Sequence, residues 1–442
     1  MIRLSDHFSL RRLLCYALPS IAMMIFSSIY GIVDGFFVSN YVGKMAFTAV
    51  NLIYPFLIIL GSIGFMFGTG GAALISKTMG EKNIKKAKET FSLIIFTSVV
   101  LGIILSILGI IFLPQIASLL GAKDEVLTDC ILYGKIILIS LPFYILQYEF
   151  QCLFSTAGKP KFGLIVTVIS GMSNIIFDYL LVAVFSLGLF GAAIATMISQ
   201  IVGGVIPLIY FFSKNKSLLH FVKFKFDIKS LLKVCSNGSS EFLSNVSSSL
   251  ISILYNLQLL KYAGENGVAA YGVLMYVSMI FQAIFIGYSI GVSPIVGYHY
   301  GAKNTSELKN VFTKSMIVIF ITAIIMFICG ELLSEPISRI FVNYDDELLQ
   351  ITKNAFRIFS FSFLLSGMSI YGSSFFTSLN NGLISALISF LRTVVFQASA
   401  VMILPIFLKL NGIWLSIVVA ELMSFIITFT FLIMKRKKYQ YI

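Results

Sequence analysis

Residues 91–113 read FSLIIFTSVVLGIILSILGIIFL, a run without a single charged side chain. A helix needs about 20 predominantly apolar residues to cross the hydrocarbon core of a bilayer, so this run is long enough for one membrane span. Eleven further segments qualify by the same measure. The twelve spans are predicted at about 13–38, 47–76, 91–113, 128–154, 162–184, 188–212, 235–260, 267–298, 314–334, 355–378, 384–406 and 411–434.

The composition of the whole chain also indicates a membrane protein. Of its 442 residues, 58% are hydrophobic and only 12% are charged, whereas a soluble domain carries about 25% charged residues. In lipid every backbone N–H and C=O group must be paired, which restricts spanning structures to helices and closed barrels. Long continuous apolar runs, rather than short alternating ones, favour helices. The predicted fold class is therefore all-α, a polytopic membrane protein.

The distribution of basic residues predicts the orientation in the membrane. The net charge of +13 does not indicate nucleic-acid binding, because the basic residues lie in short loops between apolar runs. With the predicted spans, 23 lysines and arginines fall on the side of both termini and six fall on the other side. Lys and Arg concentrate on the cytoplasmic side of membrane proteins. We therefore expect a multi-pass protein of the plasma membrane with both termini in the cytoplasm.

The chain contains an internal repeat whose spacing is half the length of the chain, which we call the half-chain spacing. Three matches share it: Gly43 with Gly264, GEKN from Gly80 with GAKN from Gly301, and Gly191 with Gly412. The sequence thus predicts two pseudo-symmetric six-helix bundles, residues 1–221 and 222–442, joined by a basic cytoplasmic loop at about 213–234. Because six is even, both halves enter the membrane from the same side. Transporters with such parallel repeats place their substrate site between the halves.

Two acidic residues inside predicted spans are the strongest candidates for a functional site. Asp34 lies in the first span and Asp178 in the fifth, with Asn174 one helical turn before Asp178. Thr196 follows in the sixth span, among small residues that let helices approach closely. Ionisable residues within a span are costly and often mark ion or proton paths. Two carboxylates, an amide and a hydroxyl form an oxygen-rich set that suits Na⁺ or a shared proton.

The alternative interpretation is that the two aspartates only cap helices or pair with a buried base. Spans one, five and six contain no Lys or Arg that could serve as this base, which favours a function. Four further charged residues, which are candidates for secondary charge sites or for structural roles, lie within spans or near their ends: Glu149, Glu241, Arg392 and Glu421. Glu421 could pair with Arg392 of the preceding span, and lipid head groups could solvate Glu241.

The sequence contains no motif for ATP binding or for hydrolysis. It has no Gly-rich loop ending in Gly-Lys-Ser/Thr, no helical zinc-protease motif and no nucleophile elbow. Its five cysteines have no paired spacing. We therefore expect neither an enzyme nor a cofactor. The expected partners are small organic substrates and membrane lipids, with no nucleic acid, and the expected state is a monomer. Tyr30, Asn51 and Asn256 are candidate residues of the substrate pathway.

Several motifs carry a resemblance to a known family. They are ALPS at 17–20, IVD at 32–34, GEKN at 80–83, AGKPK at 157–161, SPIVGY at 293–298 and GAKN at 301–304. Together they resemble the multidrug and toxic compound extrusion (MATE) family of the MOP superfamily, over nearly the whole chain. The resemblance implies two six-helix lobes that rock around a central cavity. It also implies export of organic, often cationic, compounds by antiport with H⁺ or Na⁺.

The resemblance assigns the coupling site to the first lobe. Asp34, Asn174, Asp178 and Thr196 match, in type and order, the cation site of DinF-like members and their close relatives. The acidic residues that NorM-like members carry in the second lobe have no clear match, because the tenth span contains no acid. At the half-chain spacing, Asp34 corresponds to Tyr255. The cation site, for H⁺ or Na⁺, is therefore predicted in the first half only.

The alternative function is a flippase for lipid-linked precursors, built on the architecture of the same superfamily. Such a protein needs a strongly cationic cavity to hold a pyrophosphate. Only Lys135, Arg357 and Arg392 lie within or near spans. The sequence therefore favours the multidrug antiporter.

Overall fold

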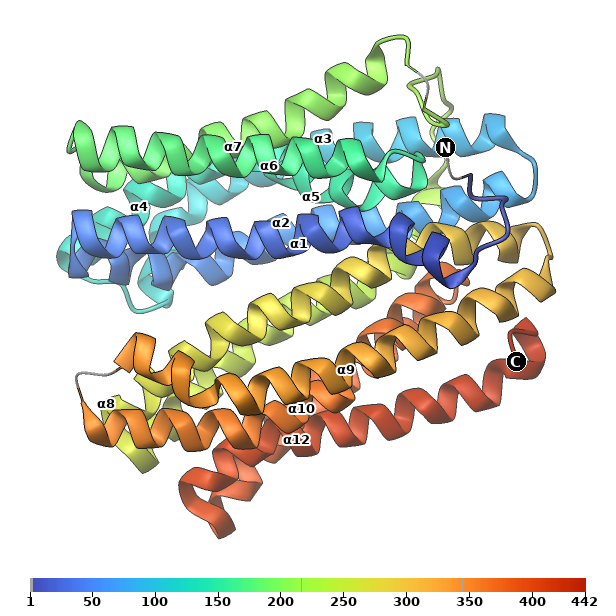
Figure 1. Ribbon diagram of the computed structural model, residues 1–442. Helices are drawn as coiled ribbons and strands as arrows, with labels where there is room; N and C mark the ends of the chain where they lie inside the picture. Colours follow the sequence, from blue (N-terminus) through green and yellow to red (C-terminus); the bar gives the residue numbers. More distant parts are fainter. Residues whose placement is uncertain (1–2, 216, 343–344) are drawn as a thin grey trace.

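The computed structural model describes residues 3–215, 217–342 and 345–442. Nearly all of these residues are helical, and no strand occurs among them (Figure 1). The helices of the first half are α1 (Leu10–Phe37), η1 (Val38–Val42), α2 (Lys44–Gly80), α3 (Ile84–Leu119), α4 (Asp124–Ile139), α5 (Leu141–Thr156), α6 (Pro160–Asp178), η2 (Tyr179–Val184) and α7 (Gly188–Phe212). Those of the second half are α8 (Ile228–Gly301), α9 (Thr305–Val342), α10 (Asp346–Ser378), α11 (Gly382–Phe390), η3 (Leu391–Gln397) and α12 (Ala398–Tyr439).

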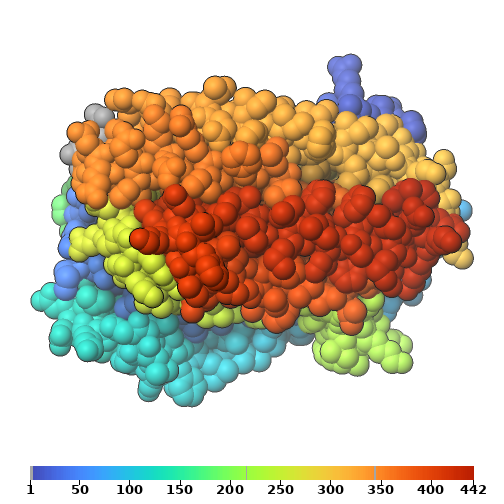
Figure 2. Space-filling view, turned by 90° about the horizontal axis from the view of Figure 1, so that it is seen from below, coloured from blue at the N-terminus to red at the C-terminus, as the bar shows by residue number. Residues whose placement is uncertain are grey.

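Apolar side chains cover much of the outside of this bundle. Phe112, Phe320 and Ile340 are 52%, 67% and 78% exposed. Figure 2 shows α12, in red, lying along one face beside the orange residues of the preceding helices. An exterior of this kind is stable in lipid and unfavourable in water. The predicted fold class, an all-α polytopic membrane protein, is confirmed.

Nine described helices are long and apolar enough to cross a membrane, or ten when α4 and α5, bent by 59° against each other, count as one span. Two of the nine are too long for a single crossing. Helix α8 has 74 residues, and the helical stretch Gly382–Tyr439 has 58. At 1.5 Å per residue α8 would be roughly 110 Å long as a straight helix, compared with about 30 Å of hydrocarbon.

A single residue with left-handed backbone breaks each of these two long helices. Gly264 in α8 has φ 59° and ψ −149°, and Lys409 in α12 has φ 49° and ψ −131°. Figure 1 shows that α8 folds back at its break, so that its two parts lie side by side. Division of the two helices at these residues would produce twelve spans. The count of twelve remains a prediction.

Contacts between the first and second halves are reciprocal. Gly80 packs against the backbone of Tyr298, and Gly301 packs against the backbone of Lys77. In both pairings a Cβ atom would overlap the facing carbonyl oxygen, so only glycine allows this approach. Lys77 and Tyr298 are themselves separated by the half-chain spacing, as are the two glycines. Such an exchange is expected at a two-fold axis between similar units.

A second set of close contacts between the halves is also related by the half-chain spacing. Gly70 of α2 packs against Gly238 in the first part of α8, and Gly291 in the second part of α8 packs against Ala17 of α1. These four residues form two pairs with the half-chain spacing. We call the contact surface formed by α1, α2 and the two parts of α8 the seam. The division of the chain into halves after residue 221 remains a proposal, and the contacts at the seam are its main support.

The connection between α7 and α8 differs from the prediction. The loop was predicted at about 213–234, but α8 already begins at Ile228. The carboxylate of Asp227 accepts a hydrogen bond from the backbone N–H of Ser230 and thereby caps the helix. It also pairs with Lys86 of α3 at 2.6 Å. The cap and the ion pair start the helix before its apolar run, which is why the apolar pattern alone placed the boundary too late.

Candidate functional site

The two aspartates lie where regular helices change into π-helices. Asp34 is close to the end of α1, which continues as η1, and Asp178 is the last residue of α6, which continues as η2. Short π-helical segments occur frequently at functional sites. Helices α1 and α6 pack against each other. The fold therefore brings two positions that are far apart in sequence into one region of the first half.

The side chain of Asp34 is held by two of the residues predicted to act with it. Its Oδ1 accepts a hydrogen bond from Thr196 Oγ1 at 3.1 Å and a longer one from Asn174 Nδ2 at 3.5 Å. Asn174 is only 2% exposed. These contacts join α1, α6 and α7 through polar side chains.

Asp178 completes the group, but without hydrogen bonds. It is fully buried, and neither of its carboxyl oxygens has a hydrogen-bond partner among the described residues. Its carboxyl group lies close enough to that of Asp34 for the two charges to interact. Burial of an isolated carboxylate is costly, so Asp178 needs a proton or a bound cation. The Oδ1 atom of Asn174 is likewise buried and without a partner, which leaves an additional oxygen ligand for such a cation.

Asp34 lines a cavity of about 210 Å³ whose wall is rich in aromatic side chains. Five tyrosines from α1, α2, α4 and α5 contribute to it: Tyr30, Tyr54, Tyr133, Tyr144 and Tyr148. The amides of Asn51, Gln147 and Gln200 add polar groups, and Tyr276 and Met279 of α8 reach in from the second half. No Lys, Arg or His is among the described residues that line this space. We call it the Asp34 cavity.

The candidate pathway residues separate into two groups. Tyr30 and Asn51 line the Asp34 cavity, whereas Asn256 is half-buried on α8 and does not line it. The tyrosines other than Tyr30, and both glutamines, were not predicted. The sequence offered no signal for them, because 20 tyrosines and 42 phenylalanines are spread over all spans.

The remaining charged candidates do not line the Asp34 cavity. Glu149 is fully buried on α5, and both of its carboxyl oxygens lack a hydrogen-bond partner among the described residues. Glu421 of α12 and Arg392 of η3 form a close ion pair at 2.7 Å. Glu241 lines a small pocket between helices of the two halves, so it is not placed simply for solvation by head groups. No cluster of three or more His, Cys, Asp or Glu side chains that could hold a metal ion occurs in the described part of the chain.

Comparison with known proteins identifies the family. A family model described as MatE matches the chain twice, at residues 19–180 and at residues 242–402. The chain belongs to the MatE family. The resemblance to MATE transporters is therefore confirmed, and membership places the protein among transporters rather than enzymes. The two matches cover corresponding parts of the predicted halves.

The sequence similarity between this MATE protein and its curated relatives extends over almost the full length of the chain. Multidrug export protein MepA of Staphylococcus haemolyticus (strain JCSC1435) is 27% identical over 403 residues, covering 90% of the chain and 86% of the relative. MepA of Staphylococcus aureus (strain MRSA252) is 26% identical over 407 residues, covering 92% and 89%. The assignment to the DinF-like branch remains a prediction.

Solved MATE structures have the same fold. A crystal structure of MATE in complex with MaL6 superposes with a TM-score of 0.93 at 20% identity, covering 99% of this chain and 98% of that one. An outward-facing conformation of a multidrug resistance MATE transporter of the MOP superfamily gives 0.93, also at 20% identity and with the same coverage. At this identity the likeness establishes the fold alone.

Proposed function

We propose that this MATE protein is a secondary active multidrug exporter that exchanges organic, often cationic, compounds for H⁺ or Na⁺. The observation that carries the proposal is the Asp34 site. It combines a buried, unpartnered carboxyl group with a second acid that faces an aromatic cavity. The relatives named above are multidrug export proteins, which supports the same substrate class.

The coupling follows from competition for negative charge. A cationic substrate in the cavity is attracted by the Asp34 carboxylate and by the faces of the surrounding tyrosines. A proton or Na⁺ that binds between Asp34 and Asp178 neutralises this attraction. Loading of the coupling ion therefore weakens substrate binding, and a change at the junction of α1 with η1 lets the substrate leave outward.

Alternating access requires two bodies that move against each other. The reciprocal glycine contacts of the seam support lobes of residues 1–221 and 222–442, related by a pseudo-two-fold axis. The proposed motion is a rocking of the lobes around the cavity, as in other transporters built from parallel repeats.

The lining of the cavity argues against the flippase. A pyrophosphate carries several negative charges and needs Lys or Arg side chains, or helix N-termini, for binding. The described lining of the Asp34 cavity has no basic residue and does have a carboxylate.

Because the basic residues are concentrated in the loops on one side, we propose that the exporter lies in the plasma membrane with both termini in the cytoplasm. We also propose that it acts as a monomer.

The decisive variant is Asp34→Asn, which keeps the shape of the side chain and removes its charge. In proteoliposomes with an imposed pH or Na⁺ gradient, we expect efflux of a cationic dye to fall by at least about tenfold, the loss of one charge-assisted contact. Glu125→Gln is the matched control, because it removes an exposed carboxylate outside the cavity. Gradient-driven efflux at the wild-type rate by the folded Asp34→Asn protein would disprove the proposal. The two gradients, applied separately, identify the coupling ion.

A further inference from the structure

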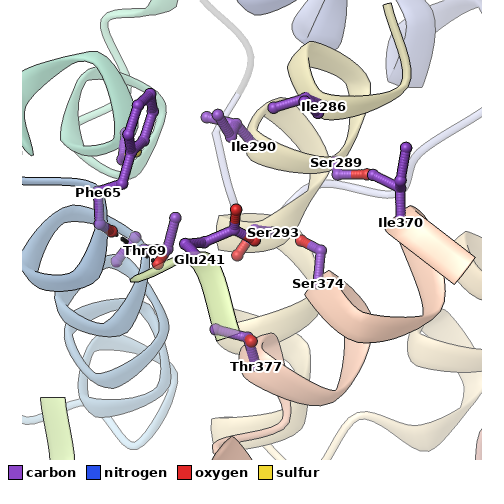
Figure 3. Close-up of a pocket in the computed structure, with 12 residues that line it drawn as sticks. Phe65, Thr69, Glu241, Ile286, Ser289, Ile290, Ser293, Ile370, Ser374 and Thr377 are labelled. Carbon is purple, nitrogen blue, oxygen red and sulfur yellow. Dashed lines mark hydrogen bonds between the residues drawn. The ribbon is translucent and has the colours of Figure 1, made fainter. Parts of the chain in front are cut away.

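Glu241 lies at the seam without a partner of its own. It sits in the first part of α8, and its carboxylate makes no hydrogen bond or ion pair with any other described residue. Its pocket has a volume of about 30 Å³ and is formed by α2 and α5 of the first half and by α8 and α10 of the second. Figure 3 shows the carboxylate directed into this space, toward the side chains of Ser293 and Ser374.

The fold itself does not require an acid at this position. At the half-chain spacing Glu241 corresponds to Ser20, which is fully buried and hydrogen-bonded to Ser155 at 2.9 Å. The first half therefore closes its side of the seam with a small hydroxyl. The second half instead places a carboxylate there and leaves a pocket beside it, which indicates a ligand.

The remaining lining indicates the chemistry of this ligand. Five hydroxyl groups line the pocket, those of Thr69, Ser289, Ser293, Ser374 and Thr377, and Phe65, Ile286, Ile290 and Ile370 supply large apolar surfaces. A small inorganic cation prefers oxygen ligands all around it. An organic cation combines a charged nitrogen with apolar substituents, and it gains from an aromatic face as well as from a carboxylate. The mixed lining therefore favours a protonated amine or a quaternary ammonium group.

The pocket is next to the Asp34 cavity. Phe65 of the pocket stacks on Tyr148 of the cavity, with ring centroids 4.2 Å apart. This aromatic pair thus lies between the two spaces, and each space contains one acid. In the present conformation the pocket has room for little more than an ammonium-sized group. Because its walls come from both halves, separation of the lobes would widen it.

We propose that Glu241 is a second recognition site for the cationic group of transported compounds, passed before or after the Asp34 cavity. The proposal rests on the exporter function argued above, and it adds a selection for positive charge that Asp34 does not supply alone. A cation held by Glu241 moves to Asp34 when the Phe65–Tyr148 stack opens.

The test compares two dyes of similar size, one a quaternary ammonium compound and one uncharged, in proteoliposomes with the full chain. For Glu241→Gln we expect the KM of the cationic dye to rise about tenfold, which corresponds to one lost charge contact. The KM of the uncharged dye should stay at the wild-type value, and Glu241→Asp should recover part of the loss. The control Glu125→Gln removes an exposed carboxylate from the first turn of α4, outside the pocket, and should change neither value.

Equilibrium binding of both dyes to the purified protein, followed by fluorescence anisotropy, separates this proposal from the exporter function. If the wild type binds the cationic dye through Glu241 but shows no gradient-driven efflux, the exporter proposal fails and the recognition site stands. An unchanged affinity of Glu241→Gln for the cationic dye overturns the recognition site. An equal loss of affinity for both dyes also overturns it, because Glu241 would then contribute to the fold or to ion coupling rather than to the recognition of positive charge. Should Glu241→Gln not fold, Glu241→Ser, which has the uncharged side chain of its counterpart Ser20, gives the same comparison.

Discussion

The ion pair between Arg392 and Glu421 allows a quantitative test of the energetics in the second half. The guanidinium donates from Nε to Oε1 at 2.9 Å and to Oε2 at 3.1 Å, and from Nη2 to Oε1 at 2.7 Å. The side chain of Glu421 is 2% exposed and that of Arg392 is 14% exposed. The pair is thus both bidentate and buried, a geometry in which each partner depends on the other.

Removal of one partner should cost far more than removal of both. Arg392→Met leaves the Glu421 carboxylate buried without a counter-charge, so we expect a loss of about 3–5 kcal/mol in the free energy of unfolding. Glu421→Met should cost less, about 1–3 kcal/mol, because the longer and more exposed arginine can reach a polar surface. The double variant Arg392→Met/Glu421→Met places apolar groups of similar length in the same space. It should lie within about 1 kcal/mol of the wild type.

These values can be measured as a double-mutant cycle in mixed micelles, with unfolding by a denaturing detergent followed by circular dichroism. The expected coupling energy is about 3 kcal/mol or more. A cycle in which the two single losses simply add would refute the reasoning. It would show that Glu421 is solvated or protonated in the folded protein, rather than neutralised by Arg392.

Two further predictions concern the seam and the loop that joins the halves. Gly301→Ala places a Cβ atom against the carbonyl oxygen of Lys77, so we expect a loss of about 1–3 kcal/mol. Gly272→Ala, which faces open space, should instead gain up to about 1 kcal/mol from helix propensity, and thermal unfolding of both variants gives the comparison. The hydrogen bond from Lys86 holds the pKa of Asp227 well below its usual range. The stability from this pair is therefore complete above the unfolded pKa of about 3.9 and is lost as the pH falls through the lower folded pKa. Asp227→Asn, which keeps the helix cap, should cost about 0.5–1 kcal/mol near neutral pH, because the pair is partly exposed; a cost that persists unchanged at low pH would contradict this account.

The fold could be predicted from the sequence because lipid imposes simple rules. Apolar runs such as residues 91–113 are long enough to cross a membrane, and α3 contains this run. Boundaries were less accurate, because polar residues outside the hydrocarbon also form helix. Helix α3 extends from Ile84 to Leu119, and α8 begins at the cap of Asp227 rather than at its apolar run. A hydrophobicity pattern cannot reveal a helix cap or an ion pair between distant segments.

The candidate site was predictable to the extent that its residues are rare. A carboxylate in an apolar span is unusual, so Asp34 and Asp178 could be singled out, and the geometry brings Asn174 and Thr196 to the former. Tyrosines are common in this chain, and which of them face a cavity depends on the rotation of each helix. The position of Glu241 was interpreted as one near head groups for a similar reason. Its distance from the helix end can be read from the sequence, but the pocket beside it arises from four helices in two halves.

The two halves share a fold but satisfy their polar groups in opposite ways. In the first half Asp34 faces a cavity, and Gln200 lines the same cavity. Their counterparts at the half-chain spacing are Tyr255, which is hydrogen-bonded to Ser416 at 2.7 Å, and Glu421, which is neutralised by Arg392. An acid with an internal counter-charge, such as Glu421, gains little from an external ion. Asp34, which has hydrogen bonds but no ion pair with a described residue, and Asp178, whose carboxyl oxygens have no partner among the described residues, do gain from one. Exchange of ions and substrates is therefore expected in the first half and at the seam.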